Sequence, residues 1–306
     1  MQVHQHLYAL PQFTKSVITI GAFDGVHKGH QKIIAALQQE AARIGGESVL
    51  ITFHPHPRKI VAGNFSLQMI NTLEEKIDLL SKYDIDHLVV VPFTPHFAEQ
   101  PAESYIRNFL VEKFKPHSII IGYDHQFGKD RKGNFDLLQK MAPEYNYNLI
   151  EIPKHVTSEI VISSTKIRTA LLESNVETAN ELLGYPFFFT GKVVSGDKLG
   201  RELGYPTANL EYTNSDKIHL GQGVYAVYVK VDEEEKKGML SIGTRPTLGE
   251  GDEKVEVNIF DFNKEIYRQE ITVIIKKYLR PQVKYSNLYE LEKQLAQDKT
   301  DSLQYL

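Results

Sequence analysis

The chain has 306 residues, a formal net charge of -4, 42% hydrophobic and 24% charged residues, and no cysteine. These values describe an ordinary globular protein of about two domains, exclude disulfides and thiolate metal sites, and fit a reducing cytoplasm. The negative charge argues against nucleic-acid binding, and the sequence has neither a signal peptide nor an apolar run near the ~20 residues of a membrane helix. We therefore expect a cytoplasmic protein whose partners include neither nucleic acid nor membranes.

The first predicted unit is the stretch 17–34, VITIGAFDGVHKGHQKII, which combines a short β-branched run, a glycine turn and the start of a helix. Gly21 and Gly25 allow the tight crossing from strand to helix. His27 and His30 then share one face of the first helical turn, where free N–H groups and the helix dipole favour an anion. Neutral or charged imidazoles can donate to phosphate oxygens there, so we interpret the corner as a phosphate site. The alternative is that one histidine caps the helix and the other is exposed.

Strand and helix patterns alternate through the first half of the chain. Continuous apolar runs, typical of strands covered on both faces, occur at 17–20, 49–53, 87–93, 118–124 and 148–153. Helical spacing occurs at 28–44, 72–83, 102–114 and 134–141. The alternation predicts a doubly wound α/β domain with a parallel sheet, whose ligands bind at the carboxyl ends of the strands.

A second helix start, ISSTKIR, occupies residues 162–168. Hydroxyls of Ser163, Ser164 or Thr165 can cap this helix, and its free N–H groups together with Lys166 or Arg168 could hold the far phosphates of a nucleotide. A plain capped helix is the alternative interpretation. A further short helix ends near residue 184, so we place the domain boundary there, with domains at 1–184 and 185–306.

The second half changes to alternating strands, turns and glycines. Five antiparallel strands are predicted from the runs FFFTGKVV, GVYAVYVKV, KKGMLSIG, KVEVNIFDF and EITVIIKKYL. They indicate a small β-barrel, followed by a helix at 288–297. In VEVNIF the polar Glu256 and Asn258 share one strand face, and Glu256 could take a proton from an attacking hydroxyl. A solvated surface carboxylate is the alternative for Glu256.

The stretch GDKLGRELGYPTANL, residues 196–210, is the most informative part of the second half. The backbone around Gly196 and Gly200 can wrap a phosphate, and Arg201 can neutralise it. Thr207 and Asn209 offer hard oxygen ligands for magnesium. Ordinary glycine and proline turns are the alternative.

The sequence FHPHPR at 53–58 raises a metal alternative, because His54 and His56 form an H-x-H pair that His27 and His30 could join to hold zinc. The two prolines more simply make a rigid extended loop. A metal-dependent hydrolase would need further ligands on later strands, where only scattered histidines occur. We therefore expect no tightly bound transition metal.

These motifs together resemble one family. GAFDGVHKGH and ISSTKIR are similar to the nucleotidyltransferase half of the prokaryotic bifunctional riboflavin kinase/FMN adenylyltransferases (FAD synthetases), and LGRELGYPTANL, GVYAVYV, SIGTRPTLG and VEVNIFDF are similar to the riboflavin kinase half. The resemblance covers nearly the whole chain in the right order. It implies a Rossmann-like domain and a barrel that convert riboflavin and ATP to FMN, then FMN and a second ATP to FAD and pyrophosphate. It also implies Mg2+ as the cofactor, with the chain a monomer or a weak homo-oligomer.

The resemblance also implies roles for individual residues. In the adenylyltransferase half, His27 and His30 would stabilise charge at the reacting phosphate, and Asp124 and Phe127 would contact the flavin. Contacts to ATP in this half are implied for Gly21, Phe23, Asp24, Gly29, Ser163, Ser164, Thr165 and Arg168.

In the kinase half, the resemblance implies that Glu256 activates the ribityl hydroxyl and that Thr207 and Asn209 bind magnesium. Contacts to ATP in this half are implied for Gly196, Lys198, Gly200, Arg201 and Pro206. The sequence departs from the family pattern at His125, Gln126, Arg268 and Tyr285, which points to altered flavin affinity. A chain with only one active half is the alternative.

Overall fold

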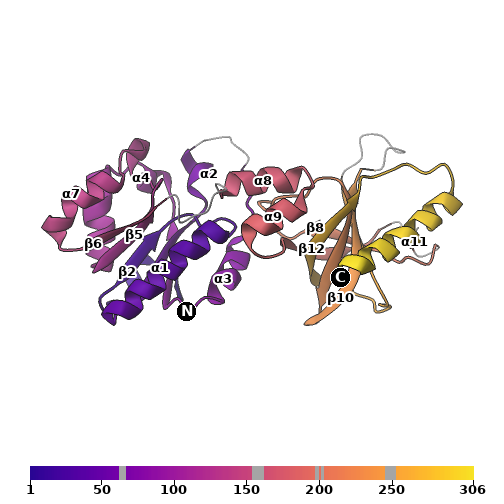
Figure 1. Cartoon of the computed structure of the whole chain (residues 1–306), viewed down its shortest axis with the longest axis horizontal. Helices are drawn as coiled ribbons and strands as arrows, with labels where there is room; N and C mark the ends of the chain where they lie inside the picture. The colour runs from indigo at the N-terminus through magenta and orange to yellow at the C-terminus, as the bar shows by residue number, and fades with distance from the viewer. Residues whose placement is uncertain (62–66, 154–161, 197–199, 201–202, 245–252) are drawn as a thin grey trace. The chain divides into compact units, whose positions relative to one another are not determined.

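The computed structural model describes residues 1–61, 67–153, 162–196, 200, 203–244 and 253–306. These residues form two compact units (Figure 1). Unit 1 consists of Met1–Leu67 and Thr72–Ser163, and unit 2 consists of Gln68–Asn71 and Ser164–Leu306. The functional boundary expected after residue 184 stays a prediction.

Unit 1 contains a six-stranded, fully parallel sheet with the strand order β1-β4-β3-β2-β5-β6. The strands are β1 (Gln2–His4), β2 (Val17–Ile20), β3 (Ser48–His54), β4 (His87–Pro92), β5 (Ser118–Gly122) and β6 (Asn148–Ile152). From β2 the chain builds outward to β3 and β4 on one side and then to β5 and β6 on the other, so the order reverses between β2 and β5. In open α/β sheets this reversal marks the place where ligands bind.

The sequence predicted five of these strands and missed β1. That strand has only three residues, and none of them is buried, so it carries no apolar run by which it could be recognised. Its parallel pairing with β4 places it at the edge of the sheet.

Helices cover the sheet of unit 1, and all but the two short ones at 57–61 and 95–98 lie where the apolar spacing predicted. They are α1 (Lys28–Ile44), α2 (Pro57–Val61), α3 (Leu73–Ser81), α4 (Pro95–Ala98), α5 (Ala102–Ser104), η2 (Tyr105–Val111), α6 (Glu112–Phe114) and α7 (Phe135–Tyr145), with short 3-10 turns η1 (Leu7–Ala9) and η3 (Lys129–Arg131). The helix expected at 102–114 is present, but its middle part, η2, is π-helical.

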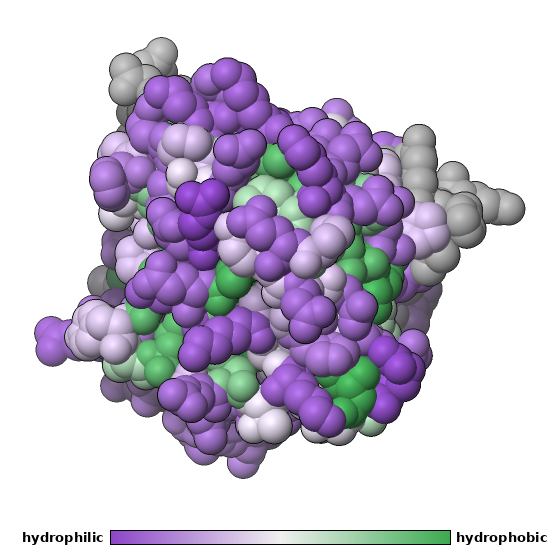
Figure 2. Space-filling view, turned by 90° about the vertical axis from the view of Figure 1, so that its left-hand side faces the viewer, coloured by the Kyte–Doolittle hydropathy of each residue, from purple (hydrophilic) through white to green (hydrophobic). Residues whose placement is uncertain are grey.

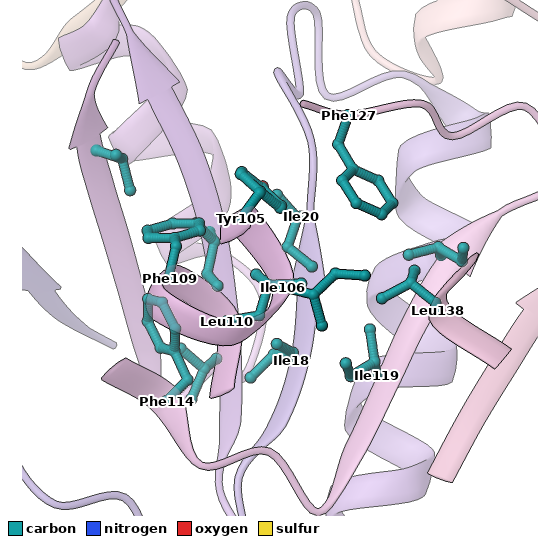
Figure 3. Packing of buried hydrophobic residues seen from close by; sticks show 14 of the residues in the cluster. Ile18, Ile20, Tyr105, Ile106, Phe109, Leu110, Phe114, Ile119, Phe127 and Leu138 are labelled. Atoms are coloured by element: carbon teal, nitrogen blue, oxygen red, sulfur yellow. The ribbon is translucent and has the colours of Figure 1, made fainter. Parts of the chain in front are cut away.

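One hydrophobic core cluster of unit 1 lies between the sheet, the π-helical segment η2 and α7. Figure 3 shows Ile18 and Ile20 from β2 close to side chains of η2, all of them buried. Aromatic rings dominate the η2 side, where Phe109 packs edge-on against Phe114 with ring centroids 5.4 Å apart. This packing fixes the position of β2, and therefore of the turn that follows it.

Unit 2 combines a closed antiparallel barrel with helices. The barrel order is β10-β11-β8-β7-β12-β9, formed by β7 (Phe188–Val194), β8 (Ala208–Tyr212), β9 (Gly223–Val231), β10 (Glu234–Gly243), β11 (Lys254–Ile259) and β12 (Glu270–Arg280). The helices are α8 (Ser164–Leu172), α9 (Val176–Leu183) and α11 (Leu288–Tyr305). The predicted barrel is confirmed, but it has six strands in the described part of the chain, and β8 was not among the five predicted. The terminal helix extends beyond the predicted end at 297.

Four residues that interrupt unit 1 in sequence, Gln68–Asn71, pack with unit 2. The N–H of Met69 donates to Asp216 O at 2.6 Å, and the buried ammonium of Lys217 donates to Ile70 O at 2.8 Å. Lys217 also lies over the ring of Phe187, 4.6 Å from its centroid. No pattern in the sequence indicated that Gln68–Asn71 packs with unit 2, because this packing depends on backbone and cation contacts between residues that are distant in sequence.

The surface seen in Figure 2 is mainly hydrophilic, and its hydrophobic residues appear as separate small areas. This face therefore shows no broad apolar patch of the kind that marks a docking surface. Among the described residues, no helix is both long enough and apolar enough to cross a membrane.

Candidate active sites

The turn after β2 holds the backbone in an uncommon conformation. Phe23, Gly25 and Val26 have φ angles of 49°, 87° and 35°, all in the left-handed region. Such angles favour glycine, and they strain a β-branched residue such as Val26. Strained turns of this kind concentrate at functional sites, where the surrounding structure holds them in place. The N–H of Gly21 anchors the start of this turn by donating to Ile51 O at 3.0 Å.

His27 and His30 come together at the N-terminus of α1, as the sequence predicted. His27 is the N-cap residue, and its Nδ1 accepts a hydrogen bond from the backbone N–H of His30 at 3.3 Å. The two rings stack with centroids 3.6 Å apart and an interplanar angle of 12°. A Cβ at Gly29 would lie 3.2 Å from the His27 ring, so glycine gives this ring its space. The alternative of one capping and one exposed histidine is correct only for the cap, because His30 is partly buried.

The hydrogen bond to His27 Nδ1 also determines where the proton of this ring lies. A nitrogen that accepts a hydrogen bond carries no hydrogen, so neutral His27 holds its proton on Nε2 and can donate from there. Burial, the neighbouring His27 ring and the Lys76 ammonium, in that order, hold the pKa of His30 well below its ordinary value. His30 is therefore a neutral ring at pH 7 in the free protein.

Buried polar side chains surround the carbonyl of Ala22, in the turn before the histidine pair. The sequence did not single out two of them, Thr52 and Lys76. The carbonyl of Ala22 accepts hydrogen bonds from Thr52 Oγ1 at 3.0 Å and from Lys76 Nζ at 2.8 Å. Asp24 and Lys76 are 1% and 4% exposed, values at which a charged side chain calls for a partner. The available signal was the buried strand position of Thr52 and a lysine among the apolar positions of α3.

The flavin-side residues follow β5, next to the switch point of the sheet. Asp124 is exposed, whereas Phe127 is buried and stacks on Tyr105 with ring centroids 5.0 Å apart. The ring centroid of His125 lies 5.7 Å from that of Phe127. Phe127 thus forms part of the core in this structure, and its contact with flavin stays a prediction.

We expect His125 to make the protein sensitive to acid. Burial lowers the pKa of His125 to about 4 from its ordinary value of 6.5. Below pH 6.5, His125 binds a proton in the unfolded chain but stays neutral in the folded protein. The free energy of unfolding therefore decreases until the pH reaches about 4. Thermal unfolding followed by circular dichroism at pH 7.0 and pH 4.5 should show a smaller fall in Tm for His125→Gln than for the parent.

The matched control for this experiment is His54→Gln, which replaces an exposed histidine at the end of β3. We expect the fall in Tm of this control to equal that of the parent. An equal fall in the parent, His125→Gln and His54→Gln would contradict the assignment.

The second predicted helix start lies at the beginning of α8. Ser164 and Thr165 occupy the first turn, and Arg168 is buried and donates from Nε to Gln68 O at 2.9 Å. Ser163 belongs to unit 1, whereas the other three belong to unit 2. Their grouping with His27 therefore stays a prediction.

In unit 2, the barrel brings together the residues predicted for the kinase reaction. Glu256 on β11 pairs with Asn209 on β8, directly across the antiparallel ladder. Thr207 Oγ1 donates to Glu256 Oε2 at 3.3 Å. A carboxylate, a hydroxyl and an amide thus lie within one small patch of two neighbouring strands. The oxygens of Thr207 and Asn209 are hard and uncharged, which suits a magnesium ion that takes its remaining ligands from water and phosphate.

The segment before β8 is held by contacts of Asn258, Asn209 and Gly200 that the sequence did not predict. Asn258, which shares a strand face with Glu256, is buried and donates from Nδ2 to Pro206 O at 2.6 Å. A Cβ at Gly196 would lie 2.0 Å from Asn209 Nδ2, so a side chain there would displace Asn209. Gly200 accepts a backbone hydrogen bond from Tyr205 at 2.8 Å. Lys198 and Arg201, both predicted to bind ATP, lie outside the described residues.

The alternative transition-metal site has no support in the described part of the chain. His54 is exposed, and His56 Nδ1 accepts from the Arg58 N–H at 3.1 Å. Within the described residues, no three His, Asp or Glu side chains are placed to hold one metal ion.

An α/β unit with a histidine pair at a helix N-terminus, followed by a barrel with a carboxylate beside hydroxyl and amide oxygens, defines a two-part transferase of phosphorus groups. Two family models match the chain: FAD synthetase at residues 10–166 and riboflavin kinase at residues 183–306. The chain belongs to the family of bifunctional riboflavin kinase/FMN adenylyltransferases.

Curated relatives cover almost all of the chain. The bifunctional riboflavin kinase/FMN adenylyltransferase of Buchnera aphidicola (subsp. Schizaphis graminum) is 37% identical, over 93% of this chain and 92% of its own length. Those of Escherichia coli K12 and Bacillus subtilis 168 are 34% and 36% identical, over 94% and 99% of this chain and 92% and 96% of their own lengths. A crystal structure titled as a macrolide-efflux protein from Streptococcus pneumoniae superposes with a TM-score of 0.89 at 28% identity, covering 99% of both chains. The predicted family and the predicted enzyme class, a riboflavin kinase and FMN adenylyltransferase, are confirmed.

Proposed function

We propose that the two reactions of this family take place at two separate sites of this chain, riboflavin phosphorylation in the barrel and FMN adenylylation at the start of α1. One observation carries this division: each unit holds its own cluster of reactive groups. Unit 1 has the stacked pair His27 and His30, and unit 2 has Glu256 with Thr207 and Asn209. The two clusters suit different chemistry.

In the barrel, the ribityl hydroxyl of riboflavin is a weak nucleophile, and a nearby carboxylate can accept its proton as the reaction proceeds. Glu256 is the base in this proposal. The hydroxyl oxygen forms a bond to the γ-phosphorus of ATP, the bond from that phosphorus to the β-phosphate oxygen breaks, and ADP leaves. A bound Mg2+ would neutralise charge on the phosphates. Thr207 and Asn209 would hold it, and the loop with Gly196, Lys198, Gly200, Arg201 and Pro206 would cover ATP.

At the start of α1, the phosphate of FMN is already anionic and needs no base. One of its oxygens forms a bond to the α-phosphorus of ATP, the bond to the β-phosphate breaks, and pyrophosphate leaves with FAD as the other product. His27 and His30 donate hydrogen bonds to the charge that develops on the α-phosphate, where fixed donors lower the barrier. Neutral rings can perform this role, since each carries one N–H.

The remaining predicted residues complete this assignment. Ser164, Thr165 and Arg168 hold the pyrophosphate, and Asp124 and Phe127 contact the flavin. The other ATP contacts of this site are Gly21, Phe23, Asp24, Gly29 and Ser163. We further propose a functional boundary between residues 184 and 185, a cytoplasmic location, and a monomer or weak homo-oligomer. The ranges of the two family models, 10–166 and 183–306, support a boundary in this region, and the lack of cysteine fits a reducing compartment.

The test is to supply riboflavin, ATP and magnesium to the purified protein and to separate the flavins over time. We expect FMN to appear first and FAD to follow, and we expect both reactions to stop when EDTA removes the magnesium. FMN that accumulates without FAD would contradict the bifunctional assignment, and full activity in EDTA would contradict the magnesium dependence.

A further inference from the structure

Lys76 is a buried cation beneath the turn that leads to the histidine pair. Its Nζ donates to Ala22 O at 2.8 Å and lies 3.4 Å from Thr52 Oγ1. Because Thr52 also donates to Ala22 O, this one carbonyl is held from strand β3 and from helix α3 at once. The strained residues of the turn begin directly after it.

The start of α3 fixes where Lys76 lies. Thr72 and Glu75 form a capping box, in which the Thr72 hydroxyl accepts from the Glu75 N–H at 3.2 Å and the Glu75 carboxylate accepts from the Thr72 N–H at 3.0 Å. Reciprocal caps of this kind set the first turn of a helix. Lys76 follows the box directly, so its side chain projects from a rigid base.

The Lys76 ammonium interacts electrostatically with the Asp24 carboxylate and the His30 ring. Burial lowers the pKa of Lys76, and the Asp24 carboxylate works against that shift by favouring the charged ammonium. The Lys76 charge in turn disfavours a proton on the neighbouring His30 ring. Loss of the ammonium would leave the buried Asp24 without this cation and would take one of two donors from Ala22.

We propose that Lys76 is a positioning residue for adenylyl transfer, which holds the turn at residues 22–27 from behind and thereby places His27 and His30 without itself contacting substrate. The inference rests on the proposed function, since it takes the histidine pair to face the phosphates of ATP. It goes further by assigning a role to a group behind the site. A misplacement of about 1 Å in reacting groups can cost about 100-fold in rate, so a backbone support of this kind affects catalysis.

The test compares Lys76→Met, Lys76→Arg and the control Lys82→Met. Lys82 is an exposed lysine at the end of the same helix, paired with Asp78 at 3.0 Å. In Lys76→Met we expect the kcat of FMN adenylylation to fall about tenfold to 100-fold with the KM for ATP nearly unchanged. We expect Lys76→Arg to retain more of the parent kcat, and Lys82→Met to match the parent.

The second measurement tests whether the Lys76 charge lies close enough to His30 to act on its ring. An NMR titration of the His30 ring in the free protein should show its pKa raised in Lys76→Met and unchanged in Lys82→Met. If Lys76→Met does not fold, Lys76→Gln takes its place, because it keeps a donor for Ala22 and removes the charge. The same rise in the His30 pKa is expected there.

Three outcomes would overturn the proposal: a parent-like kcat in Lys76→Met, an unchanged pKa of His30 after loss of the charge, or a raised KM for ATP at parent kcat, which would mark a direct ligand. A parent-like kcat in Lys76→Met, combined with loss of FAD formation in His30→Ala, would refute this inference alone. A parent rate in His30→Ala would instead refute the proposed adenylylation site.

Discussion

Glu256→Gln should reduce the conversion of riboflavin to FMN by about 100-fold to 10,000-fold and leave the conversion of supplied FMN to FAD at the parent rate. Glutamine keeps the size of the side chain and can still accept the hydrogen bond from Thr207, but it cannot take a proton from the ribityl hydroxyl. The loss therefore corresponds to the contribution of a general base. The measurement is the initial rate of each reaction, with riboflavin or FMN supplied separately and the products separated.

The matched control is Glu211→Gln, which removes an exposed carboxylate from the neighbouring strand β8. Its two rates should equal those of the parent. Riboflavin phosphorylation within tenfold of the parent in Glu256→Gln would refute the base assignment. Loss of both reactions in a folded Glu256→Gln protein would refute the division between the two units.

His30→Ala should have the opposite effect, so that FMN accumulates from riboflavin while FAD formation falls about 100-fold to 1,000-fold. The substitution removes a fixed donor from the place where charge develops on the α-phosphate, and single donors of this kind contribute that much to the rate. It also removes the stacking partner of His27, which lies 3.6 Å away between ring centroids. A time course with riboflavin, ATP and magnesium measures both effects in one reaction.

His96→Ala controls for the loss of a histidine, since His96 is exposed on α4. We expect its time course to match that of the parent. FAD formation at the parent rate in His30→Ala would show that the ring does not participate. A simultaneous loss of FMN formation would show that the two reactions share a site.

Five of the six strands and the longer helices of unit 1 could be predicted because each of them carries its own local signal. Continuous apolar runs such as 49–53 are required where helices cover both faces of a parallel strand, and β3 is buried along nearly all its length. The exposed edge strand β1 has no such run, and the π-helical turn of η2 keeps the same apolar side chains as an α-helix. The sequence therefore missed β1 and could not distinguish the π-helical η2 from an α-helix.

The sequence indicated which candidate side chains lie together wherever these residues belong to one short motif. The pair at positions 27 and 30 is three residues apart on a helix, a spacing that brings side chains onto one face whatever surrounds them. Lys76 gave no comparable signal, because its partners Ala22 and Thr52 belong to other elements and only its place among the apolar positions of α3 pointed to burial. Arg168 lies in a recognisable motif, but its observed partner, Gln68 O, belongs to a segment 100 residues earlier and could not be predicted from that motif.

The sequence by itself determined the two-part architecture, the histidine pair, and the residues Thr207, Asn209 and Glu256, because periodicity and motif spacing are local properties of the chain. Only the tertiary structure decided that the two histidine rings stack, that His27 Nδ1 accepts the His30 N–H, and that the buried Lys76 donates to the turn before them. It also decided that Gln68–Asn71 packs with unit 2. Burial, proton position and the partners of a buried charge depend on which distant segments meet, and that is set by packing of the whole fold.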